Sequence, residues 1–273
     1  MTVINTNVSA LRAQNGSRMA DSSLQTAMER LSSGKRINSA KDDAAGLAIA
    51  SSMTSQIRGM SQAVRNANDG QSMAQTADGA LDEVTNMLQR IRELAVQSAS
   101  GTYQASDRTN LQTEVTALAT QIAQIHDNTK FNGVSLFDGT AGTAGSVTIQ
   151  TGSSSADTVA MDFTSLDLSA AASIDLSTAA GATAALGSTD TLITAVATKR
   201  ATLGAAQSRL SSVVNNLTSN ITNLSDARSR IEDADFGAET TNLAKSQILA
   251  QASTAMLAQA NQSQQNVLSL LRG

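Results

Sequence analysis

The sequence predicts a mainly α-helical fold: an antiparallel long-helix coiled-coil bundle with paired N- and C-terminal helices and a small β-hairpin region. Three observations predict it. An apolar heptad repeat runs from about Ala44 to Ser98, which indicates a helix packed along other helices. Only 2% of the residues are aromatic and there is no proline, which favours thin, unbroken helix–helix seams. Weaker helical segments lie at both ends, with strong heptad helices inside them and an irregular stretch in the middle.

The first expected helix covers about Ile4–Leu31, with Asn5 or Thr6 as its N-cap. Its apolar stripe is interrupted between Gln14 and Arg18. Such a helix is marginal in water, because helical stability in proteins comes mostly from a packed face. Two interpretations stay open: a frayed helix, or a helix that orders only against another chain.

A linker and the long heptad helix come next. A Ser-Ser-Gly break at 32–34 and the pattern Ser39-x-x-Asp42 predict a new helix start, with Asp42 and Asp43 in the first turn, where the helix dipole favours negative charge. The helix is expected to end near Ser98–Gly101, where glycine suits a C-cap. After a turn at 102–107, a second heptad helix carries Leu111, Val115, Leu118, Ile122 and Ile125.

Small and polar residues dominate the stretch from Lys130 to about Asp190. A β-hairpin is predicted by apolar residues that alternate on either side of a turn-like stretch at 151–154: Val147 and Ile149, then Val159, Met161 and Phe163. A weaker prediction of further extended pieces rests on Leu166, Leu168, Ile174 and Leu176.

Two more helices are expected at the C-terminal side. A third heptad helix spans about Leu192–Ile231 and supplies a partner for the first two. The last helix, about Thr240–Leu271, carries on one side Leu249, Ala252, Met256, Ala260, Val267 and Leu270. Its polar face is almost uncharged, which indicates burial against neighbours.

Composition excludes several classes of function. With a net charge of −4, the chain lacks the excess of basic residues that is typical of nucleic-acid-binding proteins. No apolar run is long enough for a membrane span. The absence of cysteine excludes disulfides and thiolate metal sites, and the single His126 excludes a multi-His centre. No Ser or Asp marks itself as a partner for that histidine, so we expect no enzyme activity, no cofactor and no metal. Met1–Ala40 also lacks the apolar run and cleavage site of a secretion signal, which alone predicts a cytoplasmic protein.

The sequence closely resembles bacterial flagellin over most of its length. The matching motifs include INTNVSAL, RLSSGKRINSAKDDAAGLAIA, LQRIRELAVQSASGT and TKFNGVSLF on the N-terminal side, and KRATLGAAQSRL, SRIEDADF and QILAQASTAMLAQANQSQQNVLSLLR on the C-terminal side. The resemblance implies the structural subunit of the bacterial flagellar filament, secreted to the cell exterior through the flagellum's own channel without a cleaved signal. A relative with flagellin-like ends, the hook–filament junction protein, is the alternative. A zinc peptidase within the chain is excluded because no H-E-x-x-H occurs, and a stand-alone adhesin would not need such paired ends.

The resemblance also implies a layered organisation. Residues 1–41 and 237–273 would form an inner tier, residues 42–138 and 190–236 an outer tier, and residues 139–189 a short variable β-hairpin region. Polymerisation would use apolar residues of the inner tier: Ile4, Val8, Leu11, Leu24, Met28, Leu31, Leu249, Met256, Val267, Leu270 and Leu271. Many relatives carry proline where this chain has Gln264, so its last helix is expected to continue without interruption.

The partners implied by the resemblance are other subunits of the same chain, an export chaperone at the C-terminal segment, and the filament cap and hook-junction proteins. The surface recognised by the animal Toll-like receptor that senses flagellin maps onto Gln89, Arg90, Glu93, Leu94, Gln97 and Glu114. Spacings of three and four residues are expected to place Arg90 and Leu94 on an outward face, away from the Leu88–Ile91 seam. Contacts between subunits are the alternative role for this face. The sequence does not decide whether Ser and Thr in 139–189 are glycosylated.

Overall fold

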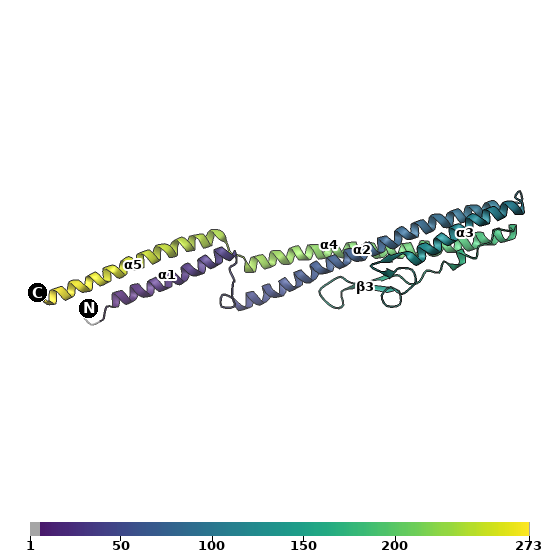
Figure 1. The fold of residues 1–273 in the computed structure, drawn as a ribbon. Helices are drawn as coiled ribbons and strands as arrows, with labels where there is room; N and C mark the ends of the chain where they lie inside the picture. Colours follow the sequence, from purple (N-terminus) through teal and green to yellow (C-terminus); the bar gives the residue numbers. More distant parts are fainter. Residues whose placement is uncertain (1–5, 273) are drawn as a thin grey trace. The chain divides into compact units, whose positions relative to one another are not determined.

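The structure is a computed structural model that describes residues 6–272, with side chains described through residue 266. Five long helices dominate it, which confirms the predicted fold class: α1 (Val8–Ser33), α2 (Ala44–Ala99), α3 (Ala105–Asn128), α4 (Ala179–Glu232) and α5 (Phe236–Arg272) (Figure 1). The chain divides into two compact units, Met1–Ser55 with Asn223–Gly273, and Gln56–Thr222. We call them the terminal unit and the central unit.

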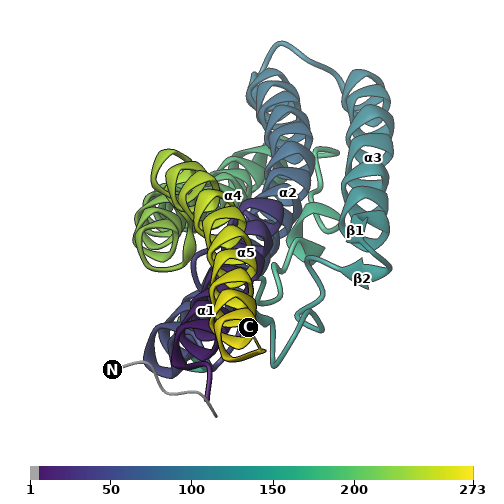
Figure 2. The same cartoon turned by 90° about the vertical axis from the view of Figure 1, so that its left-hand side faces the viewer.

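The terminal unit is built on α1 and α5, which lie side by side in Figures 1 and 2. Cross-helix contacts fix an antiparallel register. The Asn7 Nδ2 donates to the Ala260 carbonyl at 3.2 Å, and Arg30 Nη1 lies 3.9 Å from a Glu239 carboxylate oxygen near the other end of α1. Asn7 also caps α1 by accepting a hydrogen bond from the Ala10 N–H at 3.0 Å, so the prediction of Thr6 as the cap is wrong, and Asn5 lies outside the described residues.

Small side chains line the seam between α1 and α5. Ala20 and Ala27 of α1 are buried there, and a Cβ on Gly16 would lie 3.3 Å from the Ser253 hydroxyl. On α5, the residues covered at heptad spacing are Glu239, Leu243, Ser246, Ala250, Ser253, Leu257 and Ala260. The alanine, serine and glycine positions permit close approach, and the leucines of the seam, such as Leu243 and Leu257, are only half-buried. The seam therefore buries a limited apolar area and stabilises the pair weakly.

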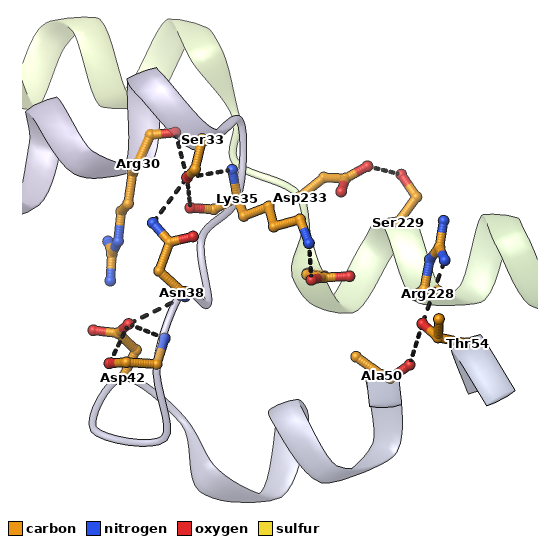
Figure 3. Close-up of polar contacts among 12 residues, drawn as sticks. Arg30, Ser33, Lys35, Asn38, Asp42, Ala50, Thr54, Arg228, Ser229 and Asp233 are labelled. Carbon is orange, nitrogen blue, oxygen red and sulfur yellow. Dashed lines mark hydrogen bonds and ion pairs between the residues drawn. The ribbon is translucent and has the colours of Figure 1, made fainter. Parts of the chain in front are cut away.

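The linker between α1 and α2 is fixed against the α4–α5 junction (Figure 3). Gly34 ends α1 in the left-handed conformation at φ 70°, as a C-cap glycine does. The Arg36 N–H then donates to the Glu232 carbonyl at 2.6 Å, and the Ala234 N–H donates to the Gly34 carbonyl at 2.9 Å. An ion pair of 2.6 Å between Lys35 Nζ and Glu232 reinforces this short antiparallel bridge.

The start of α2 differs from the prediction. The Asp42 carboxylate accepts hydrogen bonds from the Ser39 N–H and hydroxyl, each at 3.0 Å, but this closes a turn ahead of the helix. The helix begins at Ala44, where Asp43 accepts from the Gly46 N–H at 2.8 Å and serves as the cap. Backbone and hydroxyl donors from Ser39, and the Asn38 N–H, lower the pKa of Asp42 and keep it ionised.

The central unit packs α2 against α3 and α4. The predicted heptad seam of α2 is confirmed from Met60 to Ala95, since every seam residue in that span is buried. Within this seam, the small residues between Ala63 and Ala77 permit close approach: a Cβ on Gly70 would lie 3.0 Å from Ile149 and 3.3 Å from Leu210. The seams predicted for α3 and α4 join the same core through Val115, Ile122, Leu203 and Leu210.

The end of α2 is at Ala99, as predicted, but its cap is not a glycine. Gly101 does not adopt a positive φ. The Arg108 guanidinium of α3 instead donates to the carbonyls of Ser98 and Ser100, each at 2.9 Å. A cation at a helix C-terminus satisfies free carbonyls and complements the helix dipole.

Two antiparallel hairpins follow α3. The predicted hairpin is confirmed as β3 (Ser146–Gln150) paired with β4 (Thr158–Asp162), with Val147 opposite Met161. A smaller hairpin, β1 (Lys130–Phe131) with β2 (Val134–Ser135), was not predicted. Its two-residue turn is Asn132-Gly133, both with positive φ, and this dipeptide is the sequence signal that would have revealed it.

The segment after β4 forms no strand, so the prediction of further extended pieces is not confirmed, although Leu166, Leu168, Ile174 and Leu176 are buried. It contains one short 3₁₀ helix at Ser169–Ala171. Gln112 of α3 holds the segment by donating to the Ile174 carbonyl at 3.0 Å and accepting from the Leu176 N–H at 2.6 Å. Side-chain hydrogen bonds thus replace the ladder of a strand. The next helix, α4, begins at Ala179, inside the range 139–189 expected to be the hairpin region.

Candidate functional site

Large apolar side chains are exposed along the terminal helices. In α1 the exposed fractions are 43% for Val8, 52% for Leu11 and 53% for Met28, and in α5 they are 47% for Leu249 and 64% for Met256. All five belong to the residue set predicted for polymerisation. Within the described terminal unit, the α1–α5 contact leaves them uncovered. Exposed apolar residues on this pair of helices are candidates for contacts with another protein chain.

The remaining residues of the predicted set have other environments. Leu24 and Leu31 are half-buried on the side of α1 that faces α5. Ile4 lies outside the described residues, and Val267, Leu270 and Leu271 belong to the last turns of α5, whose side chains also lie outside them. Sequence reasoning missed three exposed apolar residues of α1 and α5, Met19, Phe236 and Ile248. These residues lie outside the apolar stripes predicted for the two helices. Only the register between α1 and α5 shows that they are exposed.

A polar cluster joins α2 and α3 in the central unit. The Arg90 guanidinium donates to Glu114 of α3 at 2.8 Å and to Glu93 of its own helix at 3.1 Å. The hydrogen bond to Glu114, followed by that to Glu93, raises the pKa of Arg90. Gln97 donates to the Tyr103 hydroxyl at 2.9 Å, and Gln89 is exposed. The structure therefore brings Arg90, Glu93 and Glu114 together, as the sequence predicted.

Leu94 does not belong to this outward face, so its predicted orientation is wrong. Its side chain is 1% exposed and lies in the hydrophobic core. The reason is that α2 has two partner helices in the central unit, and its buried arc is therefore wider than one seam. A second series at seven-residue spacing, Met73, Ala80, Met87 and Leu94, packs with the first and is visible in the sequence.

Charged residues also connect α4 to its neighbours. Lys199 is 7% exposed, and its ammonium donates to Asp162 at 3.0 Å and to the Thr164 hydroxyl at 2.9 Å, which fastens β4 to α4. The Thr164 N–H, more than Lys199, lowers the pKa of Asp162. On the other side, Arg200 donates to Asp78 and Asp82 of α2, each at 2.8 Å.

His126 carries no catalytic arrangement. Its Nδ1 lies 2.9 Å from Asp127, and its ring stacks on Phe137 with centroids 6.2 Å apart. It borders a cavity of about 440 Å³ floored by Ala119, Leu166 and Leu168. Among the side chains that the structure describes, no Ser hydroxyl is hydrogen-bonded to the ring, which is the contact a nucleophilic triad requires. Among residues 6–272, no cluster of three or more His, Asp or Glu side chains could hold a metal ion.

The geometry defines a class of protein: a helical subunit whose terminal helices pair through a weak seam and keep a second apolar surface uncovered. Residues 4–142 match the bacterial flagellin N-terminal helical region, and residues 186–271 match the bacterial flagellin C-terminal helical region. The chain belongs to the bacterial flagellin family. It is a structural, non-enzymatic subunit of the extracellular flagellar filament, as the resemblance implied. The expectation of a cytoplasmic protein from the missing signal is thereby corrected.

Several flagellins are similar over their full length. A flagellin of Halalkalibacterium halodurans is 46% identical over 274 residues, which cover 99% of this chain and 100% of the relative. A flagellin of Bacillus subtilis is 40% identical over 305 residues, covering 98% and 99%. The crystal structure of Bacillus cereus flagellin has a TM-score of 0.51 and 35% identity, and covers 60% of this chain and 94% of that chain.

Similarity to a hook-associated protein is confined to the fold. The structure of a putative flagellar hook-associated protein from Vibrio parahaemolyticus has a TM-score of 0.59 at 16% identity, covering 70% of this chain and 100% of that chain. The alternative of a junction protein gains no support at that identity. Within residues 6–272, no helix is both long and apolar enough to cross a bilayer.

Proposed function

We propose that the terminal helices form the inner tier of the filament and that the exposed apolar residues of α1 and α5 are the contacts that hold one subunit to the next. The observation that carries this proposal is the exposure of five large apolar side chains on a pair of helices whose own seam fully buries only small or polar residues and Glu239. The five are Val8, Leu11, Met28, Leu249 and Met256. Each of these side chains is about half-exposed in the subunit, so covering the rest on assembly contributes roughly 1 kcal/mol each. The α1–α5 seam leaves even its leucines half-exposed, which supports an arrangement that gains most of its stability from neighbouring copies.

Limited proteolysis tests whether the terminal helices are weakly stable in the monomer and protected in the filament. In the monomer, a trypsin-like protease is expected to cut at Arg18 in α1 and Lys245 in α5 at least about tenfold faster than at Arg200 in α4, because helices with little buried apolar area open at low free energy. In filaments, cleavage at Arg18 and Lys245 is expected to fall to the rate at Arg200. Equal rates at all three sites in the monomer would contradict the proposal.

A second proposal concerns the polar cluster of α2 and α3. We infer that Gln89, Arg90, Glu93, Gln97 and Glu114 serve as a recognition surface for the flagellin-sensing Toll-like receptor on the monomer. Contacts between subunits through the same face are compatible with this role. The surface combines an arginine with two carboxylates from two helices, all at least partly exposed, and arginine is enriched among residues that dominate binding energy. Leu94 would contribute indirectly, because its buried side chain holds this face of α2 against the core of the central unit.

The Arg90→Ala variant is expected to weaken receptor binding by about 2 kcal/mol, close to thirtyfold, measured by surface plasmon resonance with the receptor ectodomain. Arg92→Ala is the matched control, since Arg92 lies two residues away, is similarly exposed and pairs with Asp190 at 2.7 Å instead. An equal loss in both variants would show that the effect is not local to the cluster. Critical concentrations for polymerisation of the two variants report separately on subunit contacts.

The other proposed partners are an export chaperone, the filament cap and the hook-junction proteins, and we expect them to bind the terminal helices. An export chaperone would cover the uncovered apolar side of α5 before assembly, and the filament cap and hook-junction proteins would meet the subunits at the two ends of the filament through similarly paired helices. Co-sedimentation of a purified junction protein with filaments tests the second idea. A junction protein that binds along the filament wall rather than at its ends would contradict it.

A further inference from the structure

The methionines of this chain are divided sharply between two environments. Met19, Met28 and Met256 have exposed fractions of 72%, 53% and 64%, and all three lie on α1 or α5. The other methionines of the described residues are buried or half-buried: Met53, Met60, Met73, Met87 and Met161. Every strongly exposed thioether among residues 6–272 therefore sits on the terminal pair of helices.

We propose that Met19, Met28 and Met256 are oxidant-sensitive modification sites that control whether a subunit can enter the filament. The inference rests on the proposed role of the terminal helices. Exposure gives each thioether sulfur access to a dissolved oxidant. Two of the three, Met28 and Met256, also belong to the apolar set assigned to subunit contacts.

The chemistry needs only a hydroperoxide. The methionine sulfur attacks one oxygen of hydrogen peroxide, an S–O bond forms, the O–O bond breaks, and water leaves. The sulfur is oxidised by two electrons and the peroxide is reduced. The product, methionine sulfoxide, is polar where the thioether was apolar, and the change is reversible by methionine sulfoxide reductases.

The effect on assembly follows from burial. A thioether transfers favourably into an apolar contact, whereas a sulfoxide oxygen buried without a donor must lose its hydration uncompensated. Because the same surface is repeated in every subunit, the penalty applies to each addition step. In the assembled filament, contacts between subunits would shield these sulfurs from the oxidant. The sites would therefore react in the free subunit and be protected in the filament.

The experiment compares peroxide-treated monomer with treated filaments. Purified full-length monomer is exposed to limiting hydrogen peroxide and quenched with free methionine. Peptide mass spectrometry then follows sulfoxide at each site, and seeded polymerisation gives the critical concentration.

Sulfoxide is expected to form at Met19, Met28 and Met256 at least about tenfold faster than at Met73 and Met161. The critical concentration is expected to rise at least about tenfold, since burying one unpaired polar group suffices for that factor. Treatment with methionine sulfoxide reductases is expected to restore assembly.

Two variants isolate the three sites. The triple variant Met19→Leu, Met28→Leu, Met256→Leu keeps apolar side chains of similar size, and its critical concentration, whatever its value without peroxide, is expected to be the same after peroxide treatment. Met73→Leu, which removes a buried thioether, is expected to remain as peroxide-sensitive as the unmodified chain. Treated monomer that carries all three sulfoxides yet polymerises normally would overturn the proposal. Equal peroxide sensitivity of the triple variant, or equally fast oxidation of the three sites in filaments, would also overturn it.

A further pair of variants distinguishes failure of the oxidation proposal from failure of the proposed subunit contacts. If Leu11→Asp and Leu249→Asp subunits polymerise normally, the terminal helices are not the contact surface and the proposed function fails. If those subunits fail to polymerise but oxidised monomers assemble normally, only the oxidation control is lost.

Discussion

Filament formation is expected to be abolished by Leu249→Asp, and equally by Leu11→Asp. Each residue is an exposed leucine of the terminal unit, on α5 and α1 respectively. In the filament the substitution removes roughly 1 kcal/mol of apolar burial and adds the cost of desolvating a carboxylate, which is several kcal/mol after relaxation. The critical concentration should then exceed any attainable one. Turbidity and electron microscopy of seeded monomer measure the effect.

The matched controls are Leu11→Met and Leu249→Met, which keep the side chains apolar and should polymerise as the unmodified chain does. The thermal unfolding of the central unit should be the same in all four variants, because neither leucine belongs to its core. Leu249→Asp is also expected to recover less export chaperone in a pull-down, since the proposed chaperone surface includes this residue. Filaments of the Asp variants at the usual critical concentration, or full chaperone recovery, would contradict the assignment of this surface.

The central unit is expected to lose about 3–5 kcal/mol of unfolding free energy when Leu88 is replaced by alanine. Leu88 has no exposed surface and belongs to the core cluster that α2, α3 and α4 share. Removing its branched end loses apolar transfer energy and leaves a cavity that rigid neighbouring helices fill only in part. Urea titration followed by circular dichroism measures the change, and the slope with denaturant should stay constant.

Gln89→Ala is the natural control, because Gln89 is adjacent and exposed, and such substitutions stay within about 0.5 kcal/mol. Should Leu88→Ala cost no more than the control, the seam of α2 would not be the main support of the central unit. A loss of the expected size at Leu88 with no loss at Gln89 would show that the heptad position, and not the helix as a whole, carries the stability.

Much of the central unit could be predicted because its signal is local and periodic. The seam from Met60 to Ala95 follows from a heptad pattern that any partner helix would cover, and the alternation around Val147 and Met161 identifies a hairpin without reference to the rest of the chain. The caps were less predictable. The cation that caps α2 comes from Arg108 on the next helix, and a glycine nearby was the more obvious candidate.

The candidate surfaces show the same division. Arg90, Glu93 and Glu114 were predicted to lie together and do, because two of them share a helix face and the third lies on the neighbouring helix. Leu94 was misplaced because the width of a buried arc depends on how many helices surround it. On the terminal helices, the sequence showed apolar residues on each helix, but not which of them the partner helix covers.

The sequence by itself determined the helices, their seams, the hairpin and the flagellin family, since each of these is written in residue spacing or in extended motifs. Only the tertiary structure decided that the α1–α5 seam fully buries small residues and leaves its leucines half-exposed, that Leu11, Leu249 and the three terminal methionines remain uncovered, and that Leu94 is buried. The physical reason is that periodicity is a property of one helix. Exposure is a property of the register between helices, and that register is set by contacts between residues far apart in the chain, such as Asn7 with Ala260.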